Sequence, residues 1–222
     1  MHQLPRYSRK PKFSTIPKTV STMAFNTQQL ILASTSKIRG EMLRAAGLDF
    51  ESIKPDIDEQ KQQTEFCQLS PRALATRLAC TKALSISKTY NTQFIIGADQ
   101  TLEFESHIQH KARTASEAIS NLRDMCGKSH HLHSAVSVVK NNEILFGHTS
   151  TATLVMRPFS EHFLGAYVMQ ARDALLNSVG GYYFEGAGVQ LFESVEGDIH
   201  TILGLPLMPL LAFLRREAII PS

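Results

Sequence analysis

The stretch LILASTSKIR, residues 30–39, holds the strongest indication of how this chain folds. Its first four residues, Leu30 to Ala33, are apolar and precede small polar residues, a pattern typical of a short buried strand. A helix is predicted from Lys37 to Ala46, and Gly47 is a natural C-terminal stop for it. A buried strand that continues through a polar turn into a helix is the usual beginning of an α/β unit.

The following segments alternate between strand-like and helix-like patterns. Strands are predicted over residues 48–53, 94–98, 132–139 and 144–156 and from residue 191, and helices over residues 71–87, 114–125, 160–169 and 207–216. Asn141 and Asn142 stand between two of the strands, which predicts a hairpin. Residues 55–59 are expected to form an acidic loop and residues 106–113 a polar stretch. This alternation predicts an α/β or α+β domain.

Composition limits the class of protein. The chain has 222 residues, of which 43% are hydrophobic and 19% charged, as in an ordinary globular domain. The net charge is +3, but residues 1–29 contain five basic residues and no acidic one. The rest of the chain therefore has 18 of the 23 basic residues against all 20 acidic ones. A slightly acidic body gives no support for a nucleic-acid-binding surface.

Residues 1–28 are expected to be a disordered basic extension, and residues 29–218 a single domain. Two alternatives remain for the extension: an organellar transit peptide, or a mistaken start with Met23 as the true first residue. The extension lacks the apolar stretch of a secretory signal, and no run of apolar residues is long enough to span a membrane. Cys67, Cys80 and Cys126 show no zinc-ligand spacing, so a reducing cytoplasm is the expected location.

Hydroxyl and cationic side chains follow the first predicted strand. Ser34, Thr35 and Ser36 precede Lys37 and Arg39 at the expected start of a helix, where free backbone N–H groups and the helix dipole attract phosphate. The same residues also suit an ordinary helix cap with solvent-facing cations, and the pattern alone leaves both interpretations open. The glycines and the Gly-Lys-Ser/Thr element of a P-loop are missing.

Three further places have side chains suited to phosphate chemistry. Asp99 is expected at the carboxyl end of the strand over residues 94–98, where it could bind a divalent ion, activate a water or cap a turn. Asp56, Asp58 and Glu59 suit a hard cation, although such acidic loops are more often only solvated. Lys111 could neutralise phosphate charge, although a lone lysine is usually solvated.

Two other groups of residues resemble ligand sites less closely. His130, His131 and His133 are expected to be surface or partly buried strand residues, because no carboxylate or cysteine accompanies them at metal-ligand spacing. The glycine-rich residues 180–188 suit either tight turns or a close approach of the backbone to a ligand.

Nine short segments occur in a fixed order: LILASTSxxR (30–39), PDIDE (55–59), AxxKA (79–83), IGADQT (96–101), Lys111, GKSH (127–130), EGxG (185–188), EGD (196–198) and LGLPL (203–207). Together they resemble the Maf family of nucleoside triphosphate pyrophosphatases, over nearly the whole body of the chain. The resemblance implies a two-lobed α/β fold of the Maf and inosine-triphosphatase type. In that fold an elongated mixed sheet is flanked by helices, with a central cleft.

The same resemblance implies an activity. The α–β phosphate bond of a non-canonical or modified nucleoside triphosphate would be hydrolysed, giving a monophosphate and pyrophosphate. This reaction would clear unwanted nucleotides, with a possible role in arrest of cell division. A divalent cation, Mg²⁺ or Mn²⁺, would be required, and a homodimer is common; neither a nucleic acid nor a membrane is an expected partner. The alternative is a nucleotide-binding regulator of septum formation with weak catalysis.

Residue roles are implied by the matching motifs. Asp99 matches the catalytic carboxylate, which binds the metal or activates the attacking water, and Glu59 matches an acid that shares the metal. The residues expected to bind the substrate are Ser34, Ser36, Arg39, Lys82, Lys111 and Glu185. These roles agree with the chemistry of phosphoryl transfer, because a highly charged triphosphate needs several cations and a metal around it.

The sequence departs from the family pattern in several places. Gly40 stands where a second arginine is usual, which predicts the loss of one phosphate contact, and Ala112 replaces a proline. Glu185 stands where pyrimidine-specific members show glutamine, and Gln100 where many show threonine. A carboxylate only accepts hydrogen bonds, so Glu185 suits the N1–H and N2–H₂ donors of guanine, and the positive charge of 7-methylguanine would add attraction. A purine, perhaps methylated, is therefore expected in preference to dTTP or UTP.

Overall fold

The structure, a computed structural model, describes residues 30–221, apart from the side chains of Glu59, Gln60 and Gln63. The predicted extension at residues 1–28 therefore lies outside the described residues. The strands are β1 (Leu30–Ala33), β2 (Glu51–Ser52), β3 (Phe94–Phe104), β4 (His107–Gln109), β5 (Ser129–Lys140), β6 (Glu143–Met156) and β7 (Phe192–Glu196).

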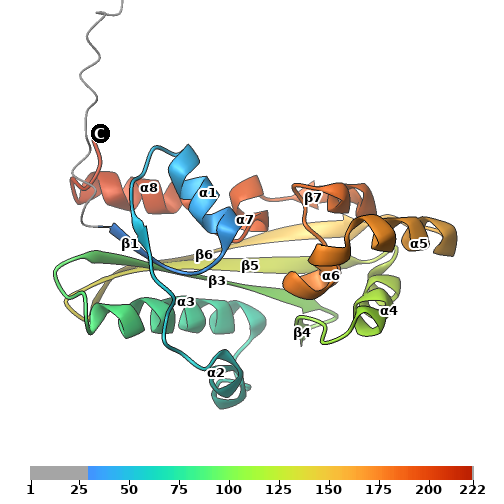
Figure 1. Cartoon of the computed structure of the whole chain (residues 1–222), viewed down its shortest axis with the longest axis horizontal. Helices are drawn as coiled ribbons and strands as arrows, with labels where there is room; N and C mark the ends of the chain where they lie inside the picture. The colour runs from blue at the N-terminus through green and yellow to red at the C-terminus, as the bar shows by residue number, and fades with distance from the viewer. Residues whose placement is uncertain (1–29, 222) are drawn as a thin grey trace, which may run out of the picture.

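These strands form one mixed sheet with the order β2-β1-β3-β5-β6-β7, and β4 pairs with β3 outside this path. Strand β1 runs parallel to β2 and to β3, and all the other pairings are antiparallel. Strands β3, β5 and β6 are long and extend along most of the molecule (Figure 1). The fold is therefore the elongated mixed α/β sheet that the sequence predicted.

Helices cover both faces of this sheet. They are α1 (Lys37–Ala45), α2 (Glu59–Glu65), α3 (Pro71–Ser87), α4 (Ala115–Met125), α5 (Glu161–Gln170), α6 (Arg172–Asn177), α7 (Ile199–Ile202) and α8 (Leu207–Arg216), with the 3-10 helices η1 (Val179–Gly181) and η2 (Ala187–Leu191). Near the β1 end, α1 and α8 lie on one face and α3 on the other (Figure 1). Helices α4, α5 and α6 gather at the opposite end.

Two separate hydrophobic clusters divide the molecule into lobes. The first joins α1 and α8 to the sheet through residues such as Leu32, Leu43 and Phe213. The second joins α4, α5 and α6 to the far half of the long strands, through residues such as Leu122 and Leu154. Burial of apolar side chains in each cluster contributes to the stability of its lobe, and the long strands pass through both.

Several predicted elements agree with the structure. Helices α3 and α8 have the predicted bounds, and the N-cap of α4 is Thr114, whose side chain accepts from the Glu117 backbone N–H. The β5–β6 hairpin turns at Asn141 and Asn142, whose φ angles are 51° and 60°. Asparagine tolerates this left-handed conformation better than most residues, which explains why it marks the turn.

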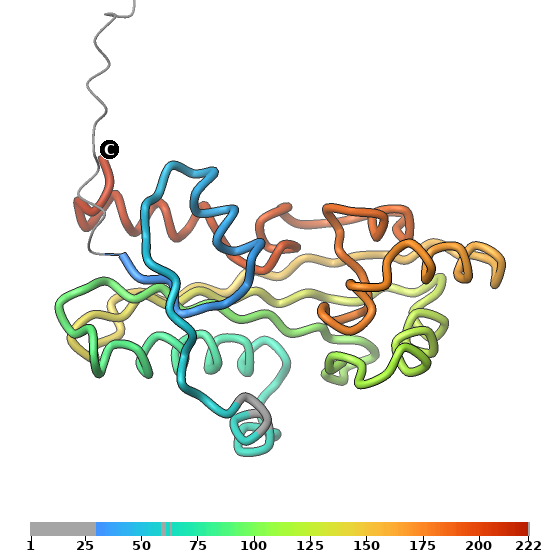
Figure 2. The backbone as a smooth tube through the Cα atoms, viewed as in Figure 1, coloured from blue at the N-terminus to red at the C-terminus, as the bar shows by residue number. Residues whose placement is uncertain are grey.

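Other expectations were wrong. The strand predicted over residues 48–53 is reduced to the two residues of β2 at the edge of the sheet. Several elements were missed. They include α2, whose N-cap Asp58 accepts from the Lys61 backbone N–H, β4, which lies within the predicted polar stretch, and the short helices α6 and α7. Asp58 therefore stabilises a helix end, and the connection from β2 to α2 runs across the sheet edge (Figure 2).

The largest correction concerns β3. It does not end at Asp99 but continues to Phe104, so Asp99 lies in the middle of an eleven-residue strand. Strand β1 stops at Ala33, opposite Gly97, and β4 pairs only from Leu102 onward. Between these two neighbours, no strand of the described chain pairs with this edge of β3. The edge around residues 98–101 is therefore open to other parts of the molecule and to a ligand.

Candidate active site

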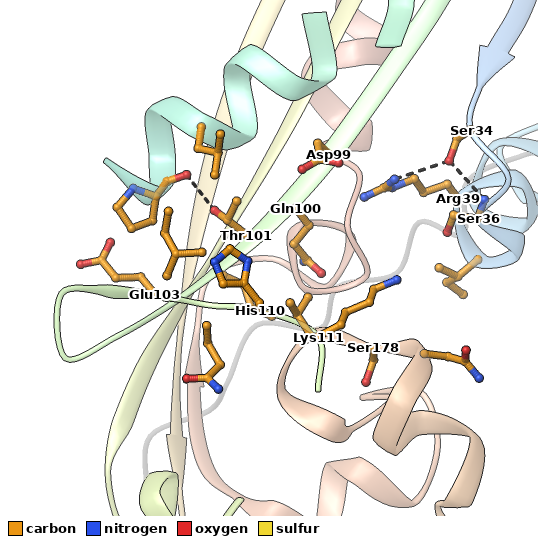
Figure 3. A pocket seen from close by; sticks show the side chains of 18 of the residues that line it. Ser34, Ser36, Arg39, Asp99, Gln100, Thr101, Glu103, His110, Lys111 and Ser178 are labelled. Atoms are coloured by element: carbon orange, nitrogen blue, oxygen red, sulfur yellow. Dashed lines mark hydrogen bonds between the residues drawn. The ribbon is translucent and has the colours of Figure 1, made fainter. Parts of the chain in front are cut away.

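A cleft of about 2530 Å³ lies along this open edge of β3. The turn after β1, the start of α3, the hairpin β3–β4 and the segment from α6 to Glu185 all contribute to its walls. Figure 3 shows Asp99, Gln100 and Thr101 along the strand, with Arg39 on one side and Lys111 on another. All the described side chains predicted to act on the substrate line this cleft.

Asp99 and Lys82 form a nearly enclosed ion pair. Lys82 Nζ lies 2.5 Å from Asp99 Oδ1, and the two side chains are 7% and 11% exposed. The close approach of α3 to β3 depends on Gly97, because a Cβ there would overlap the backbone oxygen of Ala79. Lys82 lies one turn after Ala79, and Asp99 lies two residues after Gly97 on the same face of the strand. The packing of α3 on β3 therefore brings the two charged groups together.

The turn between β1 and α1 surrounds the hydroxyl of Ser34. Ser34 is 5% exposed, and its Oγ accepts from the Ser36 backbone N–H at 3.1 Å and from Arg39 Nη1 at 3.5 Å. Ser36 is the N-cap residue of α1, but its side chain makes no cap hydrogen bond. The helix N-terminus therefore faces the cleft in the way that suits an anion.

Arg39 links three parts of the chain. Its Nε donates to the backbone oxygen of Gly204 at 2.8 Å, and its Nη1 donates to that of Ala98 at 3.0 Å. The second bond occupies a carbonyl at the open edge of β3. Arg39 lines the cleft as predicted, but part of its guanidinium already holds the turn before α8 against α1 and β3. No local pattern indicated this second role.

Gln100 points to the other face of β3 and ties it to the end of α7. Its Nε2 lies 2.9 Å from Ser134 Oγ and 3.0 Å from the backbone oxygens of both Thr201 and Ile202. Ser134 Oγ also donates to Thr201 O at 2.6 Å. The amide nitrogen of Gln100 therefore donates its hydrogen bonds to groups inside the protein. Gln100 is also one of the residues that line the cleft beside Asp99.

The β3–β4 hairpin brings Lys111 back beside the part of β3 that contains Asp99. Leu102 pairs with Gln109 in this hairpin, and the same register extended by two residues sets Lys111 opposite Gln100. Lys111 is exposed, and its amino end points into the cleft (Figure 3). A cation thus stands within the cleft near Asp99, as a site for a polyanion requires.

The chemistry of the described donors limits how a divalent metal could be held. Among residues 30–221 whose side chains are described, no group of three or more His, Cys, Asp or Glu residues could hold a metal ion. Asp99 offers one carboxylate, and Mg²⁺ is commonly bound by one or two carboxylates together with phosphate oxygens. The donors therefore fit a magnesium ion held jointly with a nucleotide. Glu59 is the first residue of α2, and its side chain lies outside the described part.

Gly40 does not line the cleft. A Cβ at this position would lie 3.2 Å from Arg44 Nη1 and 3.7 Å from the ring of Phe50. A side chain there would therefore start on the face of α1 that packs toward Phe50. Gly40, which stands where the family usually has a second arginine, lies on this face of α1. The loss of a phosphate contact at this position stays a prediction.

Glu185 lines another wall of the cleft, within the glycine-rich residues 180–188 that the sequence indicated as tight turns or as a close approach to a ligand. Tyr183, Phe184 and Asp173 also line this wall. Asp173 belongs to α6, a six-residue helix too short to show a clear hydrophobic period. No local pattern could have joined it to Tyr183, because their proximity depends on tertiary packing.

The three strand histidines have different surroundings, and none belongs to a described metal cluster. His130 is 1% exposed, and its Nε2 lies 2.6 Å from the hydroxyl oxygen of Tyr182, while its Nδ1 has no hydrogen-bond partner among residues 30–221. Burial lowers the pKa of His130 to about 4, and the neighbouring His131 contributes. His133 Nε2 lies 2.8 Å from Glu103 Oε2, a carboxylate that sequence spacing did not reveal.

Comparison with known proteins places this chain in a family. The family described as "Maf-like protein" matches residues 29–217, and the chain belongs to that family. A nucleoside triphosphate pyrophosphatase of Bradyrhizobium diazoefficiens is 46% identical over 191 residues, covering 86% of this chain and 95% of that protein. One from Rhodopseudomonas palustris is 42% identical over 199 residues, covering 90% and 98%. The predicted resemblance is therefore confirmed.

A third relative has a narrower name. The 7-methyl-GTP pyrophosphatase of Rhizobium meliloti is 42% identical over 188 residues, covering 84% of this chain and 94% of that protein. Among solved structures, the Ham1 protein of Staphylococcus aureus matches with a TM-score of 0.39 at 16% identity, over 57% of this chain and 71% of that one. The likeness to this solved structure is too distant to add to the fold assignment. Within residues 30–221, no helix has the length and hydrophobicity needed to cross a membrane.

Proposed function

We propose that this chain is a nucleoside triphosphate pyrophosphatase that cleaves the bond between the α and β phosphates. The buried pair of Lys82 and Asp99 at the open edge of β3 gives the strongest structural support. A triphosphate has about four negative charges, so it needs converging cations and a carboxylate that orients water. The names of the relatives describe hydrolases of this kind. They do not favour a weakly catalytic regulator of septum formation.

In this proposal, Asp99 orients the attacking water and accepts its proton. The oxygen of that water bonds to the α-phosphorus, the bond from phosphorus to the bridging oxygen breaks, and pyrophosphate leaves. Lys82 balances the charge of Asp99, which allows a polyanion to approach the carboxylate. Lys111 neutralises charge on the departing pyrophosphate. The backbone N–H groups at the start of α1, near Ser34 and Ser36, bind a phosphate oxygen.

A divalent cation is part of the proposal, and Mg²⁺ or Mn²⁺ would supply charge neutralisation on the phosphates when bound. Asp99 would be its ligand from the sheet, and Glu59 at the start of α2 is the second ligand that the family resemblance implies. We extend the proposal to a homodimer and to a reducing cytoplasm. The three free cysteines, Cys67, Cys80 and Cys126, are consistent with that compartment.

For the base, we propose a purine, with 7-methyl-GTP as the first candidate. Glu185 lines the cleft and is exposed to it, so its carboxylate is available to the N1–H and N2–H₂ donors of guanine. Two relatives are named 7-methyl-GTP pyrophosphatases, from Rhizobium meliloti and Brucella abortus. Clear preference for dTTP and UTP would overturn this part of the proposal.

The test is pyrophosphate release from a panel of canonical and methylated triphosphates, measured with Mg²⁺ and with Mn²⁺. The wild-type chain should turn over at least one purine triphosphate, and the Asp99→Asn variant should turn over none. Asp124→Asn is the matched control, because Asp124 is exposed on α4 and lies outside the cleft. A wild-type chain that binds triphosphates but hydrolyses none would instead support the regulator.

A further inference from the structure

The wall of the cleft that contains Glu185 is built on a rigid turn. The Gly186 backbone N–H donates to the oxygen of Tyr183 at 3.2 Å, which closes a turn over residues 183–186. A Cβ on Gly188 would overlap that same oxygen, so the next part of the chain packs directly against the turn. The turn therefore has a defined position relative to the cleft.

An aromatic anchor fixes the orientation of this turn. The ring of Phe184 lies 5.6 Å from that of Phe192 and packs against the second hydrophobic cluster. Tyr182 is 5% exposed and pairs with His130 in the interior, and its backbone is extended with φ −143° and ψ 152°. Successive side chains of extended backbone point to opposite sides. Tyr183 is accordingly 37% exposed, and it lines the cleft.

Two carboxylates accompany the Tyr183 ring. Asp173, from the first turn of α6, and Glu185 both line the cleft, and both are exposed. Burial raises the pKa of the Tyr183 phenol, and the negative charges of Asp173 and Glu185, which line the same cleft, raise it further. The phenol is therefore neutral at physiological pH, and the local charge is negative.

We infer that Tyr183 and Asp173, together with Glu185, select a positively charged purine base. The inference rests on the proposed function. An aromatic face attracts a flat cation, and carboxylates accept hydrogen bonds from its N–H groups. Lys82, Lys111 and Arg39 line the same cleft and attract phosphate. The cations and the Tyr183 group have opposite charge preferences, so the triphosphate is drawn to the cations and the base to Tyr183 and its carboxylates.

N7-methylation of guanine gives the ring a positive charge without removing its N1–H and N2–H₂ donors. Tyr183 and Asp173 should therefore distinguish 7-methyl-GTP from GTP, whereas Glu185 can hydrogen-bond to either base. Attraction of a cation to an exposed aromatic ring is about 0.5–1 kcal/mol and rises to about 2 kcal/mol when water is excluded. This corresponds to a discrimination of about 2- to 30-fold.

The experiment compares kcat/KM for 7-methyl-GTP and for GTP in the full chain with its divalent cation. Tyr183→Leu should lower the ratio of the two values about fivefold, mainly through a higher KM for 7-methyl-GTP. Tyr183→Phe keeps the ring and should preserve the ratio. Asp173→Asn should lower the ratio, whereas Glu193→Gln should not, because Glu193 is exposed and outside the cleft.

The outcomes separate this inference from the proposed function. A wild-type chain that hydrolyses no triphosphate of the panel would contradict the proposed function itself, and one that hydrolyses other triphosphates but neither of these two would contradict this inference. A wild-type chain that hydrolyses both, with an unchanged ratio in Tyr183→Leu and Asp173→Asn, would contradict only the role given to these residues. Both substitutions are at exposed positions, so folding should be preserved. Thermal unfolding of each variant checks this, and Asp173→Asn still tests the inference if Tyr183→Leu is unstable.

Discussion

Lys82 and Asp99 come from a helix and a strand that touch through backbone atoms, and their charged groups lie 2.5 Å apart in a nearly closed space. Such a pair is poorly suited to adding stability, because both charges have lost most of their hydration. Its position at the open edge of β3 instead suits the handling of a phosphate chain. The pair is therefore the first target for mutagenesis.

Removing only one partner of this pair should be more harmful than removing both. Lys82→Met leaves the charge of Asp99 without its partner and should lower the free energy of unfolding by about 3–5 kcal/mol. The double variant Lys82→Met/Asp99→Asn should recover part of that loss, although both variants should lose at least about 100-fold in kcat. Urea unfolding of the wild type, both single variants and the double variant measures the coupling. Additive losses would show that the pair is not energetically coupled.

The close packing of α3 on β3 should require glycine at position 97, because any side chain there would meet the backbone of α3. In Gly97→Ala the new Cβ would overlap the backbone oxygen of Ala79, so α3 must move away from β3 and carry Lys82 away from Asp99. We expect the free energy of unfolding to fall by about 1–3 kcal/mol, and kcat to fall as well. Gly147→Ala is the matched control, because a Cβ at this strand glycine would meet nothing within 4 Å. Equal behaviour of the two variants in unfolding and turnover assays would argue against this packing.

Gln100 should stabilise the link between β3 and α7. Gln100→Leu removes the donor near Thr201 O and Ile202 O, and at least one buried carbonyl loses a partner. The expected loss is about 1–3 kcal/mol in the free energy of unfolding. Because Gly204 follows this segment and is held by Arg39, the KM for triphosphate should rise too. Denaturant unfolding and steady-state kinetics test the two effects separately, and an unchanged KM would limit the role of Gln100 to stability.

Acid should weaken the second lobe through His130. Its pKa falls from the ordinary 6.5 to about 4 in the folded chain, so between these pH values the unfolded state binds more protons. Stability should therefore decrease as the pH falls from 6.5 toward 4, by up to about 3 kcal/mol from this group. In His130→Phe this part of the pH dependence should vanish. Urea unfolding of both proteins from pH 7.5 to 4 gives the free energy of unfolding at each pH, and the difference between the two proteins is the contribution of His130. The same pH dependence in both would contradict the lowered pKa of His130.

Local patterns were sufficient for much of the fold. Helices α3 and α8 were predicted with their observed bounds, and the Asn141-Asn142 turn identified the central hairpin. The course of β3 was not predictable locally. Gln100 and Thr101 were interpreted as the end of a strand, because their polarity is satisfied only by distant groups such as Ser134 and the Pro71 oxygen.

The candidate site, like the fold, was predictable only in part. Motif order identified Asp99, Lys82 and Lys111, and the structure brings them to one cleft. The positions of Tyr183 and Asp173 in the cleft follow from the packing of α6 against a turn that is distant in the sequence from β3. Such a relationship has no periodicity along the chain, so only the three-dimensional arrangement reveals it.

Strands β3, β5 and β6 pass from one hydrophobic cluster into the other without interruption. A hinge between the lobes would have to bend three hydrogen-bonded strands at once, which makes wide opening and closing costly. In the proposed function, the sheet therefore sets the distance between the side chains that bind phosphate and those that bind the base. A nucleotide would then be selected by its length as well as by the groups at its two ends.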